Sequence, residues 1–316
     1  SRGLGDVYKR QQRHTSENRR EKLKTSVDVE HYLYIGQNSI LMLLLPNCKI
    51  NIGLNIVSKR SDGYHNLETV FFPIPLRDNL EFKEIENEDV PYRLVSGGVP
   101  IEGKPEDNLI VKVYLDMKAE FNLPALELSL YKNIPMGAGL GGGSSDAAAM
   151  MKGLNEAYNL QLSAEDMEKR LAKFGADCPF FVRNKPAYAT GIGDELTNCN
   201  VSLKDKFIVL VKPDVFVSTK EAYAHVTPKL PAIPLAEAIK LPIETWKEQI
   251  VNDFEQSVFP FHPELPAIKQ TLYDMGAVYA SMSGSGSTMY GIFNRPTPEA
   301  NEVFDKCFVY TKKLIE

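Results

Sequence analysis

The sequence has few cysteines and no long hydrophobic run. Its four cysteines, Cys48, Cys178, Cys199 and Cys307, are far apart in the 316-residue chain and form no Cys-x-x-Cys pair. This spacing argues against a zinc site and a disulfide framework, and it is typical of a protein of the reducing cytoplasm. The longest apolar run, at residues 40–45, is far shorter than a membrane-spanning helix requires. We therefore expect a cytoplasmic protein with no membrane partner.

Excess positive charge is also absent. The chain carries 36 Lys and Arg against 41 Asp and Glu, a formal net charge of −5 at pH 7. Proteins that bind nucleic acids usually carry a basic surface, so we expect no nucleic-acid partner. An anionic ligand would have to be held by local features of its site. The hydrophobic content of 43% is that of an ordinary folded chain.

The length of the chain and two changes in its composition predict three segments. The first 41 residues are polar and basic without an apolar period, and we expect them to be a non-native leader ahead of a natural start at Met42. We expect the segment from residue 1 to residue 45 to be disordered. A second change near residue 200 suggests an N-terminal domain at 46–200 and a C-terminal domain at 201–316. We expect a monomer or a weak homodimer.

Hydrophobic periodicity predicts an α+β protein. Alternation at 48–57 places Lys49, Asn51 and Asn55 on one face of a strand, opposite its aliphatic residues. The prolines in the next strand, at 67–76, favour an edge position. Ser144 or Ser145 is the expected N-cap of a helix at 146–160. Other expected strands lie at 126–131, 207–211 and both ends of 277–293, and other helices lie at 109–121, from Ser163 to Gly175, at 234–250 and at 263–275.

The most informative segment is PMGAGLGGGSS at 135–145, in which five of the seven residues from 137 to 143 are glycine. So much glycine is costly in entropy, and it favours a loop whose backbone touches a ligand. Successive N–H groups ahead of a helix N-terminus can bind a phosphate. The hydroxyls of Ser144 and Ser145 can reach a phosphate oxygen or Mg²⁺, and Ser145 is the one candidate for a direct protein ligand to the metal.

Other phosphate-binding loops fit this segment less well. The spacing Gly137-x-Gly139-x-x-Gly142 matches the dinucleotide fingerprint, but the region that should form an acidic second strand has a helical pattern. A Walker loop would end in Gly-Lys-Ser or Gly-Lys-Thr, and this loop has no lysine. The characteristic segments of protein kinases are missing. A tight connection between a strand and a helix remains the purely structural alternative.

Three segments resemble motifs of the GHMP kinases, small-molecule kinases named for galactose, homoserine, mevalonate and phosphomevalonate. The glycine loop is similar to their phosphate-binding motif, NCKINIGLNI at 47–56 to the N-terminal motif, and SMSGSGSTMYGIF at 281–293 to the C-terminal motif. Residues 49–71 and GADCPFFV at 175–182 most resemble one branch. That branch phosphorylates a hydroxyl of a cytidine diphosphate sugar alcohol in non-mevalonate isoprenoid synthesis. The resemblance covers residues 46–316.

The resemblance implies a fold, an activity and a set of ATP-binding residues. The expected fold is a ribosomal-S5-domain-2-like N-terminal domain with a ferredoxin-like C-terminal domain, and the active site lies in the cleft between them. The expected activity is phosphoryl transfer from ATP to a small-molecule alcohol, with Mg²⁺ neutralising charge. The ATP-binding residues it implies are Asn108, Pro135, Met136, Gly137, Ala138, Gly139, Leu140, Gly141, Gly142, Gly143, Ser144 and Ser145.

Lys49 and Asp177 match the catalytic positions of the branch. An aspartate beside a lysine stays ionised, so it can accept or orient a hydroxyl proton while the lysine stabilises charge on the phosphoryl group. The resemblance assigns substrate binding to Tyr64, His65, Thr219 and Tyr223, with the aromatic residues contacting cytosine. Asn51 is a further substrate-binding candidate, because it shares a strand face with Lys49. The segment VSTKEAY at 217–223 departs from the Pro-Thr-Pro pattern more usual there.

Two other functions remain open from the sequence. The first is a GHMP kinase that acts on homoserine or on a mevalonate derivative. Tyr64 and His65 argue against it, because those substrates carry no base to stack. The second is a nucleotide or sugar-nucleotide sensor without catalytic activity. The presence of both Lys49 and Asp177 argues against that function.

Overall fold

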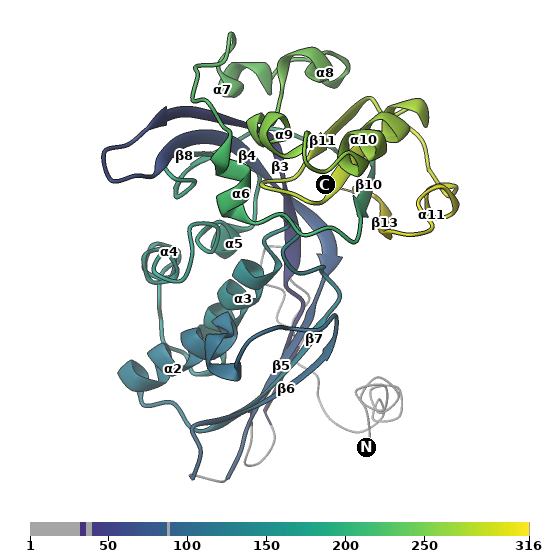
Figure 1. Ribbon diagram of the computed structural model, residues 1–316. Coiled ribbons are helices and arrows are strands. Elements are labelled where there is room, and N and C mark those ends of the chain that lie inside the picture. The colour runs from purple at the N-terminus through teal and green to yellow at the C-terminus, as the bar shows by residue number, and fades with distance from the viewer. Residues whose placement is uncertain (1–31, 36–39, 87–88, 316) are drawn as a thin grey trace.

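The computed structural model describes residues 32–35, 40–86 and 89–315, which form two stacked bodies (Figure 1). In Figure 1, purple-to-teal segments form the lower body, and green-to-yellow segments form most of the upper body. The long strands β3 (Asn47–Lys59) and β4 (His65–Arg77) run from one body into the other. Of the described helices, none is both long and apolar enough to span a membrane.

The lower body contains a five-stranded sheet in the order β1-β2-β5-β7-β6. Helices α2 and α3 lie on one face of this sheet and bury an apolar core against it. Only the β6–β7 pair is parallel. The strands are β1 (Tyr32–Ile35), β2 (Ile40–Leu44), β5 (Asn79–Glu84), β6 (Tyr92–Gly98) and β7 (Leu126–Lys132). The helices are η1 (Pro105–Asp107), α2 (Leu109–Phe121), α3 (Gly142–Ala157), α4 (Ala164–Leu171) and α5 (Phe180–Arg183).

Strand β2 corrects the expected start of the N-terminal domain. It pairs with β5, and its side chains Met42 and Leu44 are buried in the core of the lower body. A boundary at residue 46 is therefore too late, because these apolar side chains fill space between the sheet and α3. Residues 1–31 and 36–39 of the expected leader lie outside the described residues.

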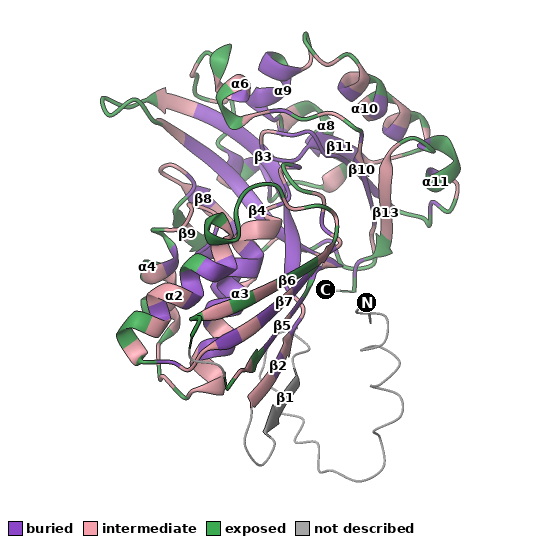
Figure 2. Cartoon of the chain, turned by 60° about the horizontal axis from the view of Figure 1, so that its bottom comes forward, coloured by how far each residue is buried: buried purple, intermediate pink, exposed green. Residues whose placement is uncertain are grey.

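Strands β3 and β4 join the two bodies through a shared hydrophobic core. They belong to a second sheet, in the order β3-β4-β8-β9, with β8 at Ala187–Thr190 and β9 at Glu195–Asn198. Ile50 and Ile52 of β3 pack in one cluster with Ile208 and Tyr290 of the C-terminal half. Most of β3 is therefore buried on both faces (Figure 2). Its predicted polar face is buried as well, at the point where the two halves meet.

The predicted edge position of β4 is wrong for the strand as a whole, because β4 lies between β3 and β8. The ladder with β8 covers only the stretch from Thr69 to Phe71. Pro73 and Pro75 lie beyond it, where β4 has no β8 partner. A proline has no N–H to donate to a neighbouring strand. Both prolines therefore lie where no β8 partner requires such a donor, as prolines in edge strands do.

The C-terminal half contains an antiparallel sheet in the order β11-β12-β10-β13. Numbered by their order in this half, the strands follow the sequence 2-3-1-4, which is the ferredoxin-like arrangement. The α+β class and this strand order confirm the predictions. The strands are β10 (Phe207–Lys212), β11 (Tyr279–Met282), β12 (Met289–Phe293) and β13 (Phe308–Lys313).

Several helices pack against this sheet or extend beyond it. They are α6 (Thr219–Ala224), α7 (Leu235–Ala238), η2 (Ile243–Thr245), α8 (Trp246–Gln249), α9 (Asp253–Val258), α10 (Glu264–Asp274) and α11 (Ala300–Val303). The single helix predicted at 234–250 is wrong. Three short helical turns occupy this stretch, since Pro242 lacks the N–H that a continuous helix would use there. The capping box of Ser163 and Asp166 is confirmed, but its helix ends at Leu171, before Gly175.

A buried ion cluster fastens the sheet of the lower body to α3. The ammonium of Lys132, at the end of β7, contacts Asp78 between β4 and β5 and lies 2.8 Å from an Oδ2 of Asp146 in α3. All three side chains are almost fully buried. Burial raises the pKa of Asp146 well above its ordinary value, against the attraction of Lys132. The two carboxylates therefore depend on one cation.

We predict that Lys132→Met lowers the free energy of unfolding by about 3–5 kcal/mol, because two buried carboxylates lose their cation. Urea denaturation monitored by circular dichroism measures the loss. The matched control is Lys173→Met, which removes a lysine–aspartate pair with the half-exposed Asp116. That surface pair should contribute about 0–1 kcal/mol. Equal losses in the two variants would contradict the prediction.

Candidate active site

The glycine-rich loop at 135–145 connects β7 to the N-terminus of α3. Gly139 and Gly141 have φ values of +73° and +68°, in the left-handed region that favours glycine. Gly141 is itself the N-cap of α3. The prediction of Ser144 or Ser145 as the N-cap is therefore wrong, because the left-handed glycine starts the helix earlier. Both serines lie in its first turn, beside the free N–H groups of the helix end.

A second glycine-rich segment, between β11 and β12, lies directly against this loop. The hydroxyl of Ser283 donates a hydrogen bond of 2.8 Å to Gly139 O. The backbone N–H of Thr288 donates to Ala138 O at 3.3 Å. A Cβ atom added at Gly139 would lie only 2.0 Å from Ser283 O. The two segments thus meet backbone to backbone, and no side chain fits at Gly139.

The structure brings Lys49 and Asp177 together at this junction. Lys49 Nζ lies 3.3 Å from Asp177 Oδ2. The lysine is 3% exposed and comes from β3, whereas the Asp177 side chain is 35% exposed and precedes α5. Lys49 Nζ also donates to Gly139 O at 3.2 Å. The ammonium is therefore fixed against the glycine loop, while the carboxylate remains accessible to a ligand.

Asn51 orients Lys49 in this structure. Its Oδ1 accepts a hydrogen bond of 2.6 Å from Lys49 Nζ, and its Nδ2 donates to Thr69 Oγ1 at 3.0 Å. The Thr69 hydroxyl in turn donates to Gly53 O at 2.5 Å. Thr69 was not identified from the sequence, because no sequence motif marks a buried threonine in a strand. Whether Asn51 also contacts a substrate stays a prediction.

Two of the predicted aromatic residues stack on each other. The rings of His65 and Tyr223 lie 5.0 Å apart with an interplanar angle of 21°, and Phe254 meets Tyr223 edge to face at 4.8 Å. Burial and, secondly, the carboxylate of Asp177 raise the pKa of Tyr223.

The remaining predicted base-binding residues lie around this stack. Tyr64 is 62% exposed, directly before His65. Thr219 is exposed at the start of α6, four residues before Tyr223 and so on the same helix face.

Asn108 is the N-cap of α2, and its Oδ1 accepts from Ile110 N at 3.1 Å. The side chain of the next residue, Leu109, is the one neighbour that a Cβ at Gly143 would meet within 4 Å, at 3.9 Å. The start of α2 therefore lies beside the glycine loop. Asn108 directly precedes the leucine that makes this contact.

Phe216 is a neighbour of the loop that the sequence did not reveal. Its Cε2 would lie 2.8 Å from a Cβ at Gly137, yet the side chain is 69% exposed. The segment holding Phe216 is tied to the second glycine-rich segment, because Ser287 Oγ donates to Val215 O at 2.6 Å. An isolated phenylalanine in a loop gives no signal of such a position.

Oxygen donors for a metal are few at this junction. Within the described part of the chain, no group of three or more His, Cys, Asp and Glu side chains could hold a metal ion. The hydroxyl of Ser145, in the first turn of α3, and the carboxylate of Asp177, which pairs with Lys49, are two oxygen donors at this junction.

Comparisons with known proteins agree with these features. The GHMP kinases N-terminal domain matches residues 108–185, and the GHMP kinases C-terminal domain matches residues 235–307. A 4-diphosphocytidyl-2-C-methyl-D-erythritol kinase of Parabacteroides distasonis is 49% identical over 274 residues, covering 86% of this chain and 100% of the relative. The kinase of the same name from Bacteroides thetaiotaomicron is 54% identical over 252 residues, or 80% and 92% of the two chains.

A solved structure extends the comparison to three dimensions. The crystal structure of a 4-(cytidine 5'-diphospho)-2C-methyl-D-erythritol kinase superposes with a TM-score of 0.72 at 29% sequence identity. The match covers 85% of this chain and 98% of that one. The similarity therefore spans both halves of the fold and the junction between them.

We predict that Gly139→Ala destabilises the protein more than Gly276→Ala does. Both glycines have positive φ, so both substitutions carry strain of about 1–2 kcal/mol. A Cβ at Gly276 would meet nothing within 4 Å, whereas one at Gly139 would collide with Ser283 O. The collision should cost a further 1–3 kcal/mol or so. Denaturant unfolding of both variants measures the difference, and identical values would show that the two segments do not press together.

Proposed function

The chain belongs to the GHMP kinase family and has its fold, and on this premise we propose that it is a 4-diphosphocytidyl-2-C-methyl-D-erythritol kinase. It transfers the γ-phosphoryl group of ATP to the 2-hydroxyl of that cytidyl substrate, a step of non-mevalonate isoprenoid synthesis. The observation that carries the proposal is the 3.3 Å contact of Lys49 with Asp177 beside the glycine loop. Identities of 49% and 54% to kinases of this name support the choice of substrate.

The glycine loop binds the triphosphate in this proposal. Its backbone N–H groups and the N-terminus of the 16-residue helix α3 supply partial positive charge to the phosphates. The side chains at the start of α2, with Asn108, border the nucleotide. Little covalent chemistry is required of the protein, so positioning and charge stabilisation account for most of the catalysis.

Asp177 and Lys49 act on the acceptor and on the transferring group. The acceptor oxygen forms a bond to the γ-phosphorus as the bond from that phosphorus to the ADP oxygen breaks. The hydroxyl proton passes to the Asp177 carboxylate, whose Oδ2 lies 3.3 Å from Lys49 Nζ. Lys49, held by Asn51 and Gly139 O, stabilises the negative charge on the phosphoryl oxygens.

Mg²⁺ fits the oxygen donors of the site. The ion binds mainly to the ATP phosphates and neutralises part of their charge. The hydroxyl of Ser145 is the protein donor proposed for it, since the first turn of α3 faces the phosphate position.

His65 and Tyr223 bind the cytosine, together with Tyr64 and Thr219. Stacked aromatic rings provide a flat apolar surface for a base, and an imidazole can hydrogen-bond the base edge. Homoserine and mevalonate carry no base, so this aromatic group favours the cytidyl substrate over those of other GHMP kinases.

Four free cysteines support the proposed cytoplasmic location.

We predict that wild-type protein releases ADP from ATP, Mg²⁺ and the cytidyl substrate, and that Asp177→Asn is slower by about 10²–10⁴-fold. A coupled ADP assay measures both rates. Asp116→Asn is the matched control, because it neutralises a partly exposed aspartate whose lysine partner, Lys173, lies at the protein surface. Turnover of homoserine or mevalonate instead of the cytidyl compound would overturn the substrate assignment. Full activity of Asp177→Asn would overturn the role of the carboxylate.

We predict that Tyr223→Ala raises the KM for the cytidyl substrate by about 5- to 150-fold, since stacking on one base contributes about 1–3 kcal/mol. The KM for ATP should change little, because Tyr223 lies on the acceptor side. Tyr223→Phe keeps the ring and should retain the wild-type KM. Steady-state kinetics with each substrate varied in turn provide the test. An unchanged acceptor KM in Tyr223→Ala would exclude the ring from base binding.

A further inference from the structure

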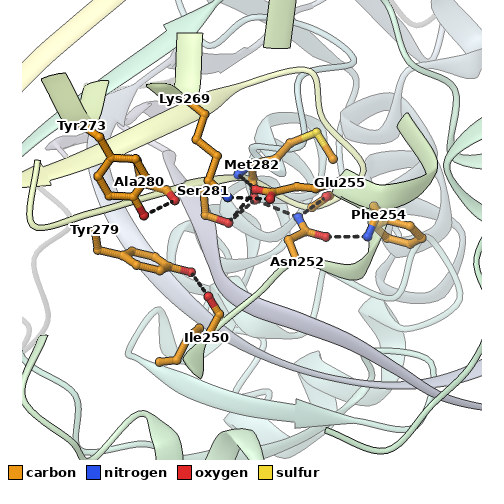
Figure 3. Close-up of polar contacts among 11 residues, drawn as sticks. Ile250, Asn252, Phe254, Glu255, Lys269, Tyr273, Tyr279, Ala280, Ser281 and Met282 are labelled. Atoms are coloured by element: carbon orange, nitrogen blue, oxygen red, sulfur yellow. Dashed lines mark hydrogen bonds and ion pairs between the residues drawn. The ribbon is translucent and has the colours of Figure 1, made fainter. Parts of the chain in front are cut away.

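Asn252 occupies a buried position where three parts of the C-terminal half meet (Figure 3). It is 2% exposed and is the N-cap of α9, with its Oδ1 accepting from Phe254 N at 3.0 Å. Its Nδ2 donates to Met282 O and to Gly284 O, each at 2.8 Å. Both amide hydrogens are thus used, and the bond from Phe254 fixes which end of the amide is the oxygen.

The two carbonyls that Asn252 binds lie on either side of Ser283. Ser283 is buried, and its hydroxyl donates to Gly139 O at 2.8 Å while accepting from Asn51 N at 3.3 Å. Gly139 O is also the acceptor for Lys49 Nζ. The hydrogen bonds of Asn252 hold the backbone on both sides of Ser283. The Ser283 hydroxyl and Lys49 Nζ then share Gly139 O as their acceptor, so the α9 N-cap is linked through Ser283 to the ammonium that faces Asp177.

Glu255, in the first turn of α9, holds the strand that leads into Ser283. Its Oε1 accepts from Ser281 Oγ at 3.1 Å and from Met282 N at 2.9 Å, and its Oε2 pairs with Lys269 at 2.5 Å. Figure 3 shows these contacts converging on the same turn of chain as those of Asn252. Glu255 fixes the chain before Ser283, whereas Asn252 contacts carbonyls on both sides of it.

We propose that Asn252 is a positioning residue for phosphoryl transfer, which acts by fixing Ser283 and, through Gly139, the ammonium of Lys49. The proposal rests on the kinase function proposed above. The segment from Ser283 to Ser287 alternates serine and glycine, so its own backbone preferences are weak and external contacts must hold it. A displacement of about 1 Å near reacting groups can cost on the order of 100-fold in rate.

The test is a double-mutant cycle with Asn252→Ser, Ser283→Ala and the double variant, assayed for ADP release. Serine keeps an N-cap acceptor for α9 but cannot donate to both carbonyls. We expect kcat of Asn252→Ser to fall by about 10- to 100-fold. The KM for the cytidyl substrate should stay within twofold, because serine keeps the N-cap contact to Phe254, the residue that packs on Tyr223. The double variant should be no slower than the slower single variant.

Tyr273→Phe is the matched control. It removes another hydrogen bond to the same strand, from Tyr273 OH to Ala280 O at 3.1 Å, without touching the Ser283 turn. Its kcat should equal that of wild type, although its melting temperature falls. All rates are measured well below the melting temperature of each variant. If Asn252→Ser does not fold, Asn252→Asp, which keeps the side-chain shape and the cap, replaces it in the cycle.

Three results would overturn the inference. The first is a wild-type kcat in the Asn252 variant, and the second is rate losses of Asn252→Ser and Ser283→Ala that multiply in the double variant. The third is an equal loss of kcat in Tyr273→Phe, which would indicate general destabilisation. A wild-type protein without turnover would contradict the proposed function itself, and it is therefore distinguishable from all three.

Discussion

The site depends on the close approach of two glycine-rich backbones, one from each half of the chain. Gly139 and Ser283 are so near that a Cβ at residue 139 would lie 2.0 Å from a carbonyl oxygen. Gly139 O receives hydrogen bonds from both Ser283 and Lys49, so the same contact joins the halves and places the ammonium of Lys49. Because strands β3 and β4 share a core with the C-terminal sheet, the contact is supported from behind by apolar packing.

The charged groups near this contact divide into two kinds. The ion cluster of Lys132 with Asp78 and Asp146 is buried and holds the sheet against α3, the helix that follows the glycine-rich loop. Such a cluster is costly to disrupt but contributes nothing to a substrate directly. Asp177, in contrast, is partly exposed and pairs with a buried lysine. An anchored cation and an accessible carboxylate suit a reaction in which a proton leaves as a phosphoryl group arrives.

Sequence patterns predicted the elements whose signals are local. The strand at 48–57, the capping box of Ser163 and the paired strands around residues 283–287 are present, and so is the ferredoxin-like order that the family resemblance implied. Longer-range features could not be read in this way. The start of the fold at β2 depends on packing against α3, and the helix N-cap at Gly141 depends on a backbone conformation that a hydroxyl pattern does not encode. Asn252 and Thr69 acquire their roles only when distant segments meet.

The most direct test of the account is a crystal structure with a non-hydrolysable ATP analogue and the cytidyl substrate bound together. The account predicts that the γ-phosphate lies against the glycine loop within hydrogen-bonding distance of Lys49 Nζ. The acceptor hydroxyl should contact Asp177, and the cytosine should contact Tyr223. Phosphates bound away from the loop, or an acceptor hydroxyl remote from Asp177, would contradict the account.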